Sequence, residues 1–195
     1  MFEEIIKFGR ELFVQGLNNS HSGNISIRRK NLIYITKHSA RLGSLSSQDI
    51  VYVNLKDDKK DKQASIETKV HRAIYLAIPH ARTIVHAHPP YAVTLSLNYD
   101  IIIPDDMEGK YYLPEIPVLS KCEDTISSDC VVQYLPPLFE TYNLVVIKGH
   151  GTFAIGKSLE EAYLYTSVCE SASKIMVLNK LLKLSNNVCS SGGGF

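Results

Sequence analysis

Apolar residues recur in regular patterns along the first third of the chain. Over residues 2–13 they approximate one face of a helix, and Gly16 follows where such a helix is expected to end. Short alternating runs rich in β-branched residues come next and predict strands. We expect these strands at residues 24–27, 32–36 and 50–55.

Beyond a mixed-charge loop at residues 56–62, the pattern alternates between helical and extended segments. Ser65 is placed as the N-cap of a helix over 67–77, and the box formed by Ser158 and Glu161 opens a long final helix. The three prolines of 101–117 favour a loop. The other elements expected are strands at 83–87, 144–148 and 152–155 and helices at 91–97 and 127–138.

This alternation lacks a strict βαβ repeat. It therefore predicts a single α/β domain over residues 1–184, with a mixed or antiparallel central sheet flanked by helices. Residues 185–195, which end in Ser-Ser-Gly-Gly-Gly-Phe, are expected to be a disordered tail.

Composition and charge exclude several classes of function. The 195 residues are 45% hydrophobic and 21% charged, with a net charge of +1, which is typical of a globular protein. We find no basic patch along the sequence that would hold nucleic acid or a membrane surface, and no apolar run long enough to span a bilayer. The acidic start is unlike a signal peptide. The four cysteines lack CxxC spacing, so we expect reduced thiols in a cytoplasmic protein.

One segment matches a nucleotide-binding pattern literally. Residues 151–158, GTFAIGKS, fit GxxxxGK[ST]. The interior Thr-Phe-Ala-Ile is typical of a strand and is poorly suited to curl around phosphate groups. Only one helix and a tail follow, which leaves no place for the acidic residue that binds Mg²⁺. We interpret Gly156 and Lys157 as a turn before a helix.

The histidines carry the strongest chemical signal. His86 and His88 lie two residues apart at the end of an apolar strand, so their side chains project from the same face, about 7 Å apart. His150 follows a second apolar strand and is flanked by glycines, which let the backbone approach a ligand closely. Three imidazoles from two strand ends would form a catalytic-type metal site with positions left open for water or substrate.

Two further residues have open interpretations. Glu67, at the predicted start of a helix, is either a first-turn acid favoured by the helix dipole or a fourth metal ligand and proton carrier. His71, one turn later, is either a residue that supports the site or a structural histidine.

Taken in order, several segments resemble the class II aldolase/adducin family, especially its L-fuculose-1-phosphate aldolase branch. The resemblance runs from the first helix to the final one. It is carried by residues 22–26, 35–36, 65–67, 85–88, 149–151 and 159–162.

The resemblance implies an α/β domain around a largely antiparallel sheet, assembled as a homotetramer. It also implies a lyase in which one divalent metal per subunit, usually zinc, stabilises the enediolate left when a C–C bond of a small keto sugar phosphate breaks. The metal ligands implied are His86, His88, His150 and Glu67, and Glu67 is also the acid/base. The substrate-binding residues implied are Gly23, Asn24, His38, Ser39 and Ser65.

The chain departs from the family pattern in two places. His38-Ser39 replaces Thr-Gly in the phosphate turn, and Ile66 replaces a serine. Val118 occupies the place of the tyrosine that the fuculose-phosphate enzyme contributes across a subunit interface, with Tyr111, Tyr112 and Glu115 nearby as candidate replacements. Two alternatives therefore stay open: a pentulose-phosphate dehydratase or 4-epimerase with the same metal site, and a non-catalytic adducin-like module.

Overall fold

The structure is a computed structural model that describes residues 1–57, 62–122, 126 and 128–191. Its centre is an eight-stranded sheet in the order β3-β2-β1-β4-β8-β7-β6-β5. All neighbouring strands pair antiparallel except β6 and β7, which are parallel. The predicted α/β fold with a mostly antiparallel sheet is confirmed. The strands are β1 Asn24–Arg29, β2 Leu32–Thr36, β3 Ile50–Asn54, β4 Thr83–Ala87, β5 Ile101–Ile102, β6 Ile116–Leu119, β7 Leu144–Ile147 and β8 Gly151–Gly156.

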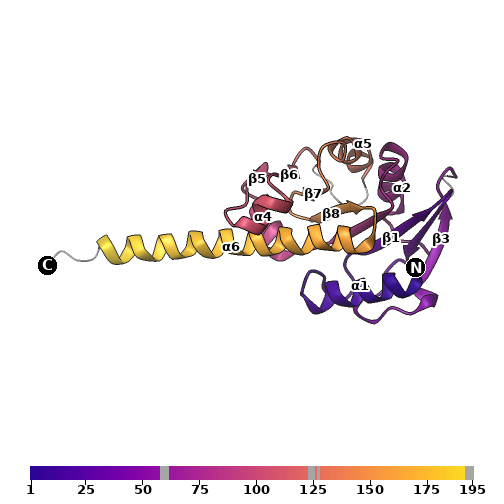
Figure 1. The fold of residues 1–195 in the computed structure, drawn as a ribbon, viewed down its shortest axis with the longest axis horizontal. Helices are drawn as coiled ribbons and strands as arrows, with labels where there is room; N and C mark the ends of the chain where they lie inside the picture. Colours follow the sequence, from indigo (N-terminus) through magenta and orange to yellow (C-terminus); the bar gives the residue numbers. More distant parts are fainter. Residues whose placement is uncertain (58–61, 123–125, 127, 192–195) are drawn as a thin grey trace.

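Helices cover both faces of the sheet, with α2 and α5 on one side and α1 and α6 on the other (Figure 1). Alternation along the strands feeds two apolar cores, so that Ile84 packs into the core under α2 while its neighbour Val85 packs into the core under α1. The helices are α1 Phe2–Val14, α2 Thr68–Ala77, α3 Pro90–Ser96, α4 Met107–Tyr112, α5 Asp129–Leu138 and α6 Leu159–Ser191, with short 3₁₀ turns at Leu42–Ser44 and Ser47–Asp49.

Two segments differ from the sequence-based expectation. Residues 101–117 contain β5, α4 and the start of β6 rather than a loop. Pro117 is tolerated in β6 because it pairs with the edge strand β5, whereas the ladder to β7 uses only Val118 and Leu119. The predicted N-cap Ser65 is replaced by Glu67, at the first position before α2.

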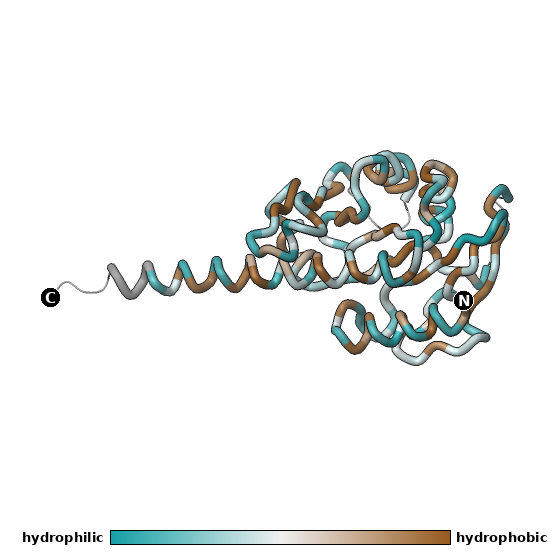
Figure 2. The backbone as a smooth tube through the Cα atoms, viewed as in Figure 1, coloured by the Kyte–Doolittle hydropathy of each residue, from teal (hydrophilic) through white to brown (hydrophobic). Residues whose placement is uncertain are grey.

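The final helix is longer than expected. α6 runs to Ser191, so residues 185–191 of the expected disordered tail are helical, because extending a formed helix costs much less than starting one. Residues 192–195 of that expected tail lie outside the described residues. Its C-terminal part extends beyond the body of the protein (Figure 1), and apolar and polar residues alternate along it (Figure 2). Among the described residues, no helix has both the length and the hydropathy needed to cross a membrane.

The expectation of reduced cysteines is wrong for one pair. Cys122 and Cys130 form a disulfide, with their Cα atoms 5.7 Å apart. Cys122 lies shortly after β6 and Cys130 lies in the first turn of α5, so the chain returns to bring them together despite a spacing without any familiar motif. Cys169, on α6, is a buried free thiol, and burial raises its pKa.

A buried polar network lies beneath α2. The hydroxyl oxygen of Ser26 is 2.7 Å from Nδ1 of His71 and 2.8 Å from the Tyr75 hydroxyl, which also donates to the Ser26 carbonyl. All three side chains are essentially inaccessible to solvent. Burial lowers the pKa of His71 to about 3, so the ring is neutral. Between the two interpretations of His71, the structure favours a buried residue that fixes α2, and with it Glu67, on the sheet.

The disulfide predicts a thiol count. In denaturant without reductant, two of the four cysteines should react with a thiol reagent, and all four should react after reduction. A count of four before reduction would show that Cys122 and Cys130 are reduced and that our original expectation is right.

His71 predicts a pH dependence of stability. Its pKa is about 3 in the folded protein and ordinarily 6.5, so below pH 6.5 only the unfolded chain binds the proton. Stability due to His71 is therefore complete above pH 6.5 and falls by about 1.4 kcal/mol per pH unit down to the folded pKa. His86 and His88 also have lowered pKa values and contribute to the slope, so the effect of His71 is the difference between wild type and His71→Gln. Urea unfolding between pH 6 and 4 should show a slope that is smaller in His71→Gln by about 1.4 kcal/mol per pH unit. Equal slopes would contradict a neutral, buried His71.

Candidate metal centre

Strand β4 positions two of the three candidate histidines. His86 is paired with Asn24 of β1 on one side and with Phe153 of β8 on the other. His88 lies just past the strand, and its backbone N–H donates to the carbonyl of Leu17. Pro89 and Pro90 then turn the chain into α3. The central place of β4 in the sheet thus fixes both histidines.

His150 reaches the same place from the turn between β7 and β8. Its backbone N–H donates to Ile147, and the next residue, Gly151, faces Ala87 of β4. A Cβ atom at Gly151 would overlap the Ala87 carbonyl oxygen and lie 3.3 Å from the His86 ring. Glycine is therefore required for this turn to bring His150 close to β4.

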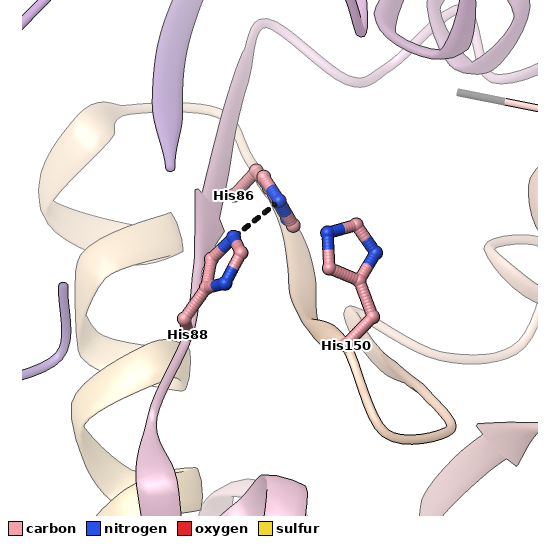
Figure 3. Close-up of side chains that lie close together, drawn as sticks. All are labelled: His86, His88 and His150. Carbon is pink, nitrogen blue, oxygen red and sulfur yellow. Dashed lines mark hydrogen bonds between the residues drawn. The ribbon is translucent and has the colours of Figure 1, made fainter. Parts of the chain in front are cut away.

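The three rings converge at one point (Figure 3). Their candidate ligand atoms lie within 4.8 Å of one another, and the Nε2 atoms of His86 and His88 are 3.0 Å apart. The His150 ring centroid is 4.9 Å from that of each other histidine. His86 is buried, whereas His88 and His150 are partly accessible, so the cluster can be reached from solvent.

Glu67 joins the cluster through His86. Its Oε2 is 3.1 Å from Nε2 of His86 and accepts a hydrogen bond of 3.3 Å from the Asn24 side chain. Only 3% of Glu67 is exposed, although it lies at the start of α2 where an acidic residue is usually solvated. A simple first-turn acid does not explain this burial against a histidine.

The electrostatics of the cluster favour a cation. Nδ1 of His86 donates to the carbonyl of Thr152 at 2.9 Å, which leaves a lone pair on Nε2 facing the Glu67 carboxylate and His88. Burial, followed by the charges of His88 and His150, holds the pKa of His86 well below its ordinary value. Burial and His150 lower the pKa of His88 to about 4. Neutral imidazoles and a carboxylate that converge in this way are the donor set of a divalent metal ion.

The fit to a metal is supported by what surrounds His86. A ligating histidine ordinarily donates its other ring N–H to an oxygen, and the Thr152 carbonyl accepts that hydrogen here. Phe153 stacks on the His86 ring, with centroids 4.2 Å apart. Both contacts fix the direction in which Nε2 points. Neither Thr152 nor Phe153 was a candidate from sequence, because one acts through its backbone and the other resembles a core residue.

The five candidate substrate residues come from three loops that lie together. Gly23 has φ of +76°, and a Cβ there would overlap the Asn18 side chain and the His86 carbonyl oxygen, so the backbone passes close beside both residues. The loop with His38 and Ser39 is joined to the loop with Ser65, because His38 N–H donates to Gln63 and Ser65 N–H donates to Thr36.

The two ends of this loop group differ in accessibility. His38 and Ser39 are exposed, whereas Ser65 is buried and its hydroxyl accepts from the N–H of Glu67 at 3.3 Å. Thr36 links these loops, because its hydroxyl accepts from the N–H of Ile25 and its carbonyl accepts from the N–H of Ser65. Sequence inspection did not select this residue.

The candidate replacements for the missing tyrosine, Tyr111, Tyr112 and Glu115, lie in and shortly after α4. Tyr111 is 79% exposed and contacts Tyr112 edge to face at the end of α4. Glu115 accepts a hydrogen bond from the Tyr142 hydroxyl. Val118 is buried in β6. Their part in the site stays a prediction.

Comparison with known proteins gives consistent results. The family model described as "Class II Aldolase and Adducin N-terminal domain" matches residues 3–177. The chain is 28% identical over 176 residues to L-fuculose phosphate aldolase of Methanococcus vannielii, covering 89% of this chain and 93% of that protein. It is 26% identical over 165 residues to methylthioribulose-1-phosphate dehydratase of Pseudoalteromonas translucida, covering 76% of each.

A solved structure is similar over the whole chain. The L-fuculose-1-phosphate aldolase of Thermus thermophilus superposes with a TM-score of 0.89 at 30% identity, covering 100% of this chain and 97% of that one. The family match, the sheet order and the clustered histidines agree, and the chain belongs to the class II aldolase/adducin family.

Proposed function

We propose that this protein is a metal-dependent aldolase that cleaves or forms a C–C bond in a small keto sugar phosphate such as L-fuculose 1-phosphate, giving dihydroxyacetone phosphate and an aldehyde. The observation that carries the proposal is the convergence of His86, His88 and His150 with the buried carboxylate of Glu67. Relatives described as L-fuculose phosphate aldolases support the substrate class.

His86, His88 and His150 would hold one divalent ion, most simply Zn²⁺, with Glu67 as a fourth ligand. When bound, the ion supplies Lewis-acid stabilisation of the negative charge that develops on substrate oxygens. The protein contributes a fixed geometry, because Thr152 and Phe153 hold the ring of His86 and the Gly151 turn holds His150.

Glu67 is the group that we assign to proton transfer. Its carboxylate lies among the three loops and is held by the amide of Asn24, so it is directed toward a substrate bound beside the histidines. A buried carboxylate next to polar donors can exchange a proton with a substrate hydroxyl or carbon at close range. Asn24 would keep the carboxylate oriented while the proton moves.

The substrate phosphate would bind between the three loops. Ser39 and Ser65 offer hydroxyl groups, Gly23 lets the backbone come close, and His38 offers a ring N–H donor. Exposed His38 and Ser39 at one end and buried Ser65 beside Glu67 at the other give a path from solvent to the acid/base.

A dehydratase is the second candidate because one relative is a methylthioribulose-1-phosphate dehydratase. A 4-epimerase would use the same residues. In the aldolase and dehydratase reactions Glu67 would move a proton at the carbon next to the carbonyl, so these two chemistries differ in what leaves. A non-catalytic module is less consistent with Glu67, because burying a carboxylate against histidines is costly without a cation.

The homotetramer and cytoplasmic location that we expected stay predictions. Exposed apolar side chains on and before α4 support an assembly, since Ile103, Met107 and Tyr111 are 58%, 87% and 79% exposed. Large apolar side chains left in solvent together are typical of subunit contacts.

Variants separate metal binding from proton transfer. Glu67→Gln should lower turnover at least about a hundredfold while largely retaining the metal, because three histidines remain. His86→Ala should lose the metal itself, measured by elemental analysis. Glu108→Gln, an exposed acid on α4, should change neither. Full activity in Glu67→Gln would exclude the proton-transfer role.

The reaction itself is tested by synthesis. Metal-loaded protein incubated with dihydroxyacetone phosphate and a short aldehyde should form a new C–C bond, detected by NMR of the product. Exchange of a substrate proton with solvent without condensation would retain the enediolate chemistry but exclude the aldolase. A protein that binds no metal after purification and reconstitution would favour the non-catalytic module.

A further inference from the structure

A basic cavity lies at the opposite end of β4 and β8 from the histidines. Its volume is about 830 Å³. Five basic residues and one acidic residue line it, and four of the basic residues remain when Arg28, whose guanidinium donates to backbone carbonyls, is set aside. The charged lining residues are Arg28, Arg29, Lys30, Arg82, Lys157 and Glu4.

These cations are not neutralised by the protein. In the described ranges, none of the five forms a salt bridge, and the carboxylate of Glu4 lies 3.0 Å from the N-terminal amine instead. Arg28 is 9% exposed and donates to the backbone carbonyls of Tyr75 and Pro79. Burial and then the positive charge of Arg82 lower the pKa of Arg28. Two guanidinium groups thus repel each other without a carboxylate between them.

The last two residues of the segment that matches the nucleotide-binding pattern, Lys157 and Ser158, line this cavity. Residues 151–156 are the strand β8, as its residue types predicted, so their N–H groups are committed to the sheet. The N–H of Lys157 donates to Glu161 at 2.6 Å, and the Ser158 hydroxyl accepts from Glu161 N–H. What remains for a ligand is the Lys157 ammonium and the hydroxyl hydrogen of Ser158, both on exposed residues.

We propose that this cavity is a binding site for a small phosphorylated anion, separate from the histidine cluster. The guanidinium groups of Arg29 and Arg82 can bind phosphate through paired N–H donors, and an ammonium and a hydroxyl add further donors. Apolar walls from Ile27 and Leu32 and the ring of Tyr34 would contact an organic part of the ligand. The volume suits a small organic phosphate.

One small substrate does not fill both places. Arg82 precedes His88 by six residues along an extended strand, a separation of about 20 Å at 3.3 Å per residue. A phosphate in the basic cavity is therefore too far from the histidines to belong to a sugar phosphate bound there. The inference goes beyond the proposed function and does not depend on it.

Residue-resolved titration tests the site. The ¹⁵N-labelled, metal-loaded full chain is titrated at constant ionic strength with inorganic phosphate in one arm and glycerol 3-phosphate in the other. We expect saturable shifts of the amides of Arg29, Lys30, Lys157 and Ser158 in at least one arm. The amides of Gly23 and Ser39 report binding at the proposed active site separately. A response in both arms indicates phosphate recognition alone, and a response only to the ester shows that the apolar walls contribute.

Charge-removing variants test the contacts. Arg82→Gln and Lys157→Gln should each weaken binding about tenfold, the loss expected for one charged hydrogen bond. Both side chains are exposed, and the Arg82 backbone keeps its bond to Gly156, so folding should be retained. Lys110→Gln, an exposed lysine on α4, is the matched control and should bind normally. Shifts that do not saturate, or that Lys110→Gln weakens equally, would overturn the proposal.

Discussion

The antiparallel pairing of β4 with β8 runs from Thr83 opposite Gly156 to Ala87 opposite Thr152. This register places the Thr152 carbonyl beside His86 Nδ1, stacks Phe153 on the same ring, and brings the turn with His150 against the end of β4. A slip by one residue would send His86 to the other face of the sheet. The convergence of the histidines is therefore a consequence of strand pairing. Residue 151 must be glycine, because a Cβ atom there would overlap the Ala87 carbonyl oxygen.

Burial of His86 against Glu67 has an electrostatic cost, and the arrangement of the two side chains shows what would offset it. His86 and Glu67 are almost fully buried, and their facing atoms are a lone pair and a carboxylate oxygen. Such groups repel unless a proton or a cation lies between them, and the lowered pKa values of His86 and His88 disfavour the proton at neutral pH. The same burial that destabilises the empty arrangement would make it bind a divalent ion strongly, which links folding to metal binding.

Sequence patterns predicted the parts of this structure that side-chain type determines. The strand ends that carry His86, His88 and His150 were predicted because apolar runs bounded by glycine or proline are distinctive. The support around them was not predictable. The group that holds His86 at Thr152 is a backbone carbonyl, which every residue type has. The helix α4 lies in a proline-rich stretch, where a loop is expected. The disulfide joins cysteines whose proximity depends on how β6 leads into α5. These features depend on which backbone segments come into contact, and the order of the strands in the sheet determines those contacts.

The gathering of basic residues at one end of the sheet is another feature that the sequence alone did not predict. A net charge of +1 and the lack of a long basic run gave no sign of an anion site, yet the turn after β1, the start of β4 and the end of β8 each contribute a cation to one cavity. Antiparallel neighbours bring the end of one strand beside the start of the next, so residues far apart in sequence gather at a sheet edge. For β4 and β8, one end gathers imidazoles and the other end gathers guanidinium and ammonium groups. Two paired strands can therefore support two chemically distinct sites. The same register positions both ends, but different side chains lie at each end.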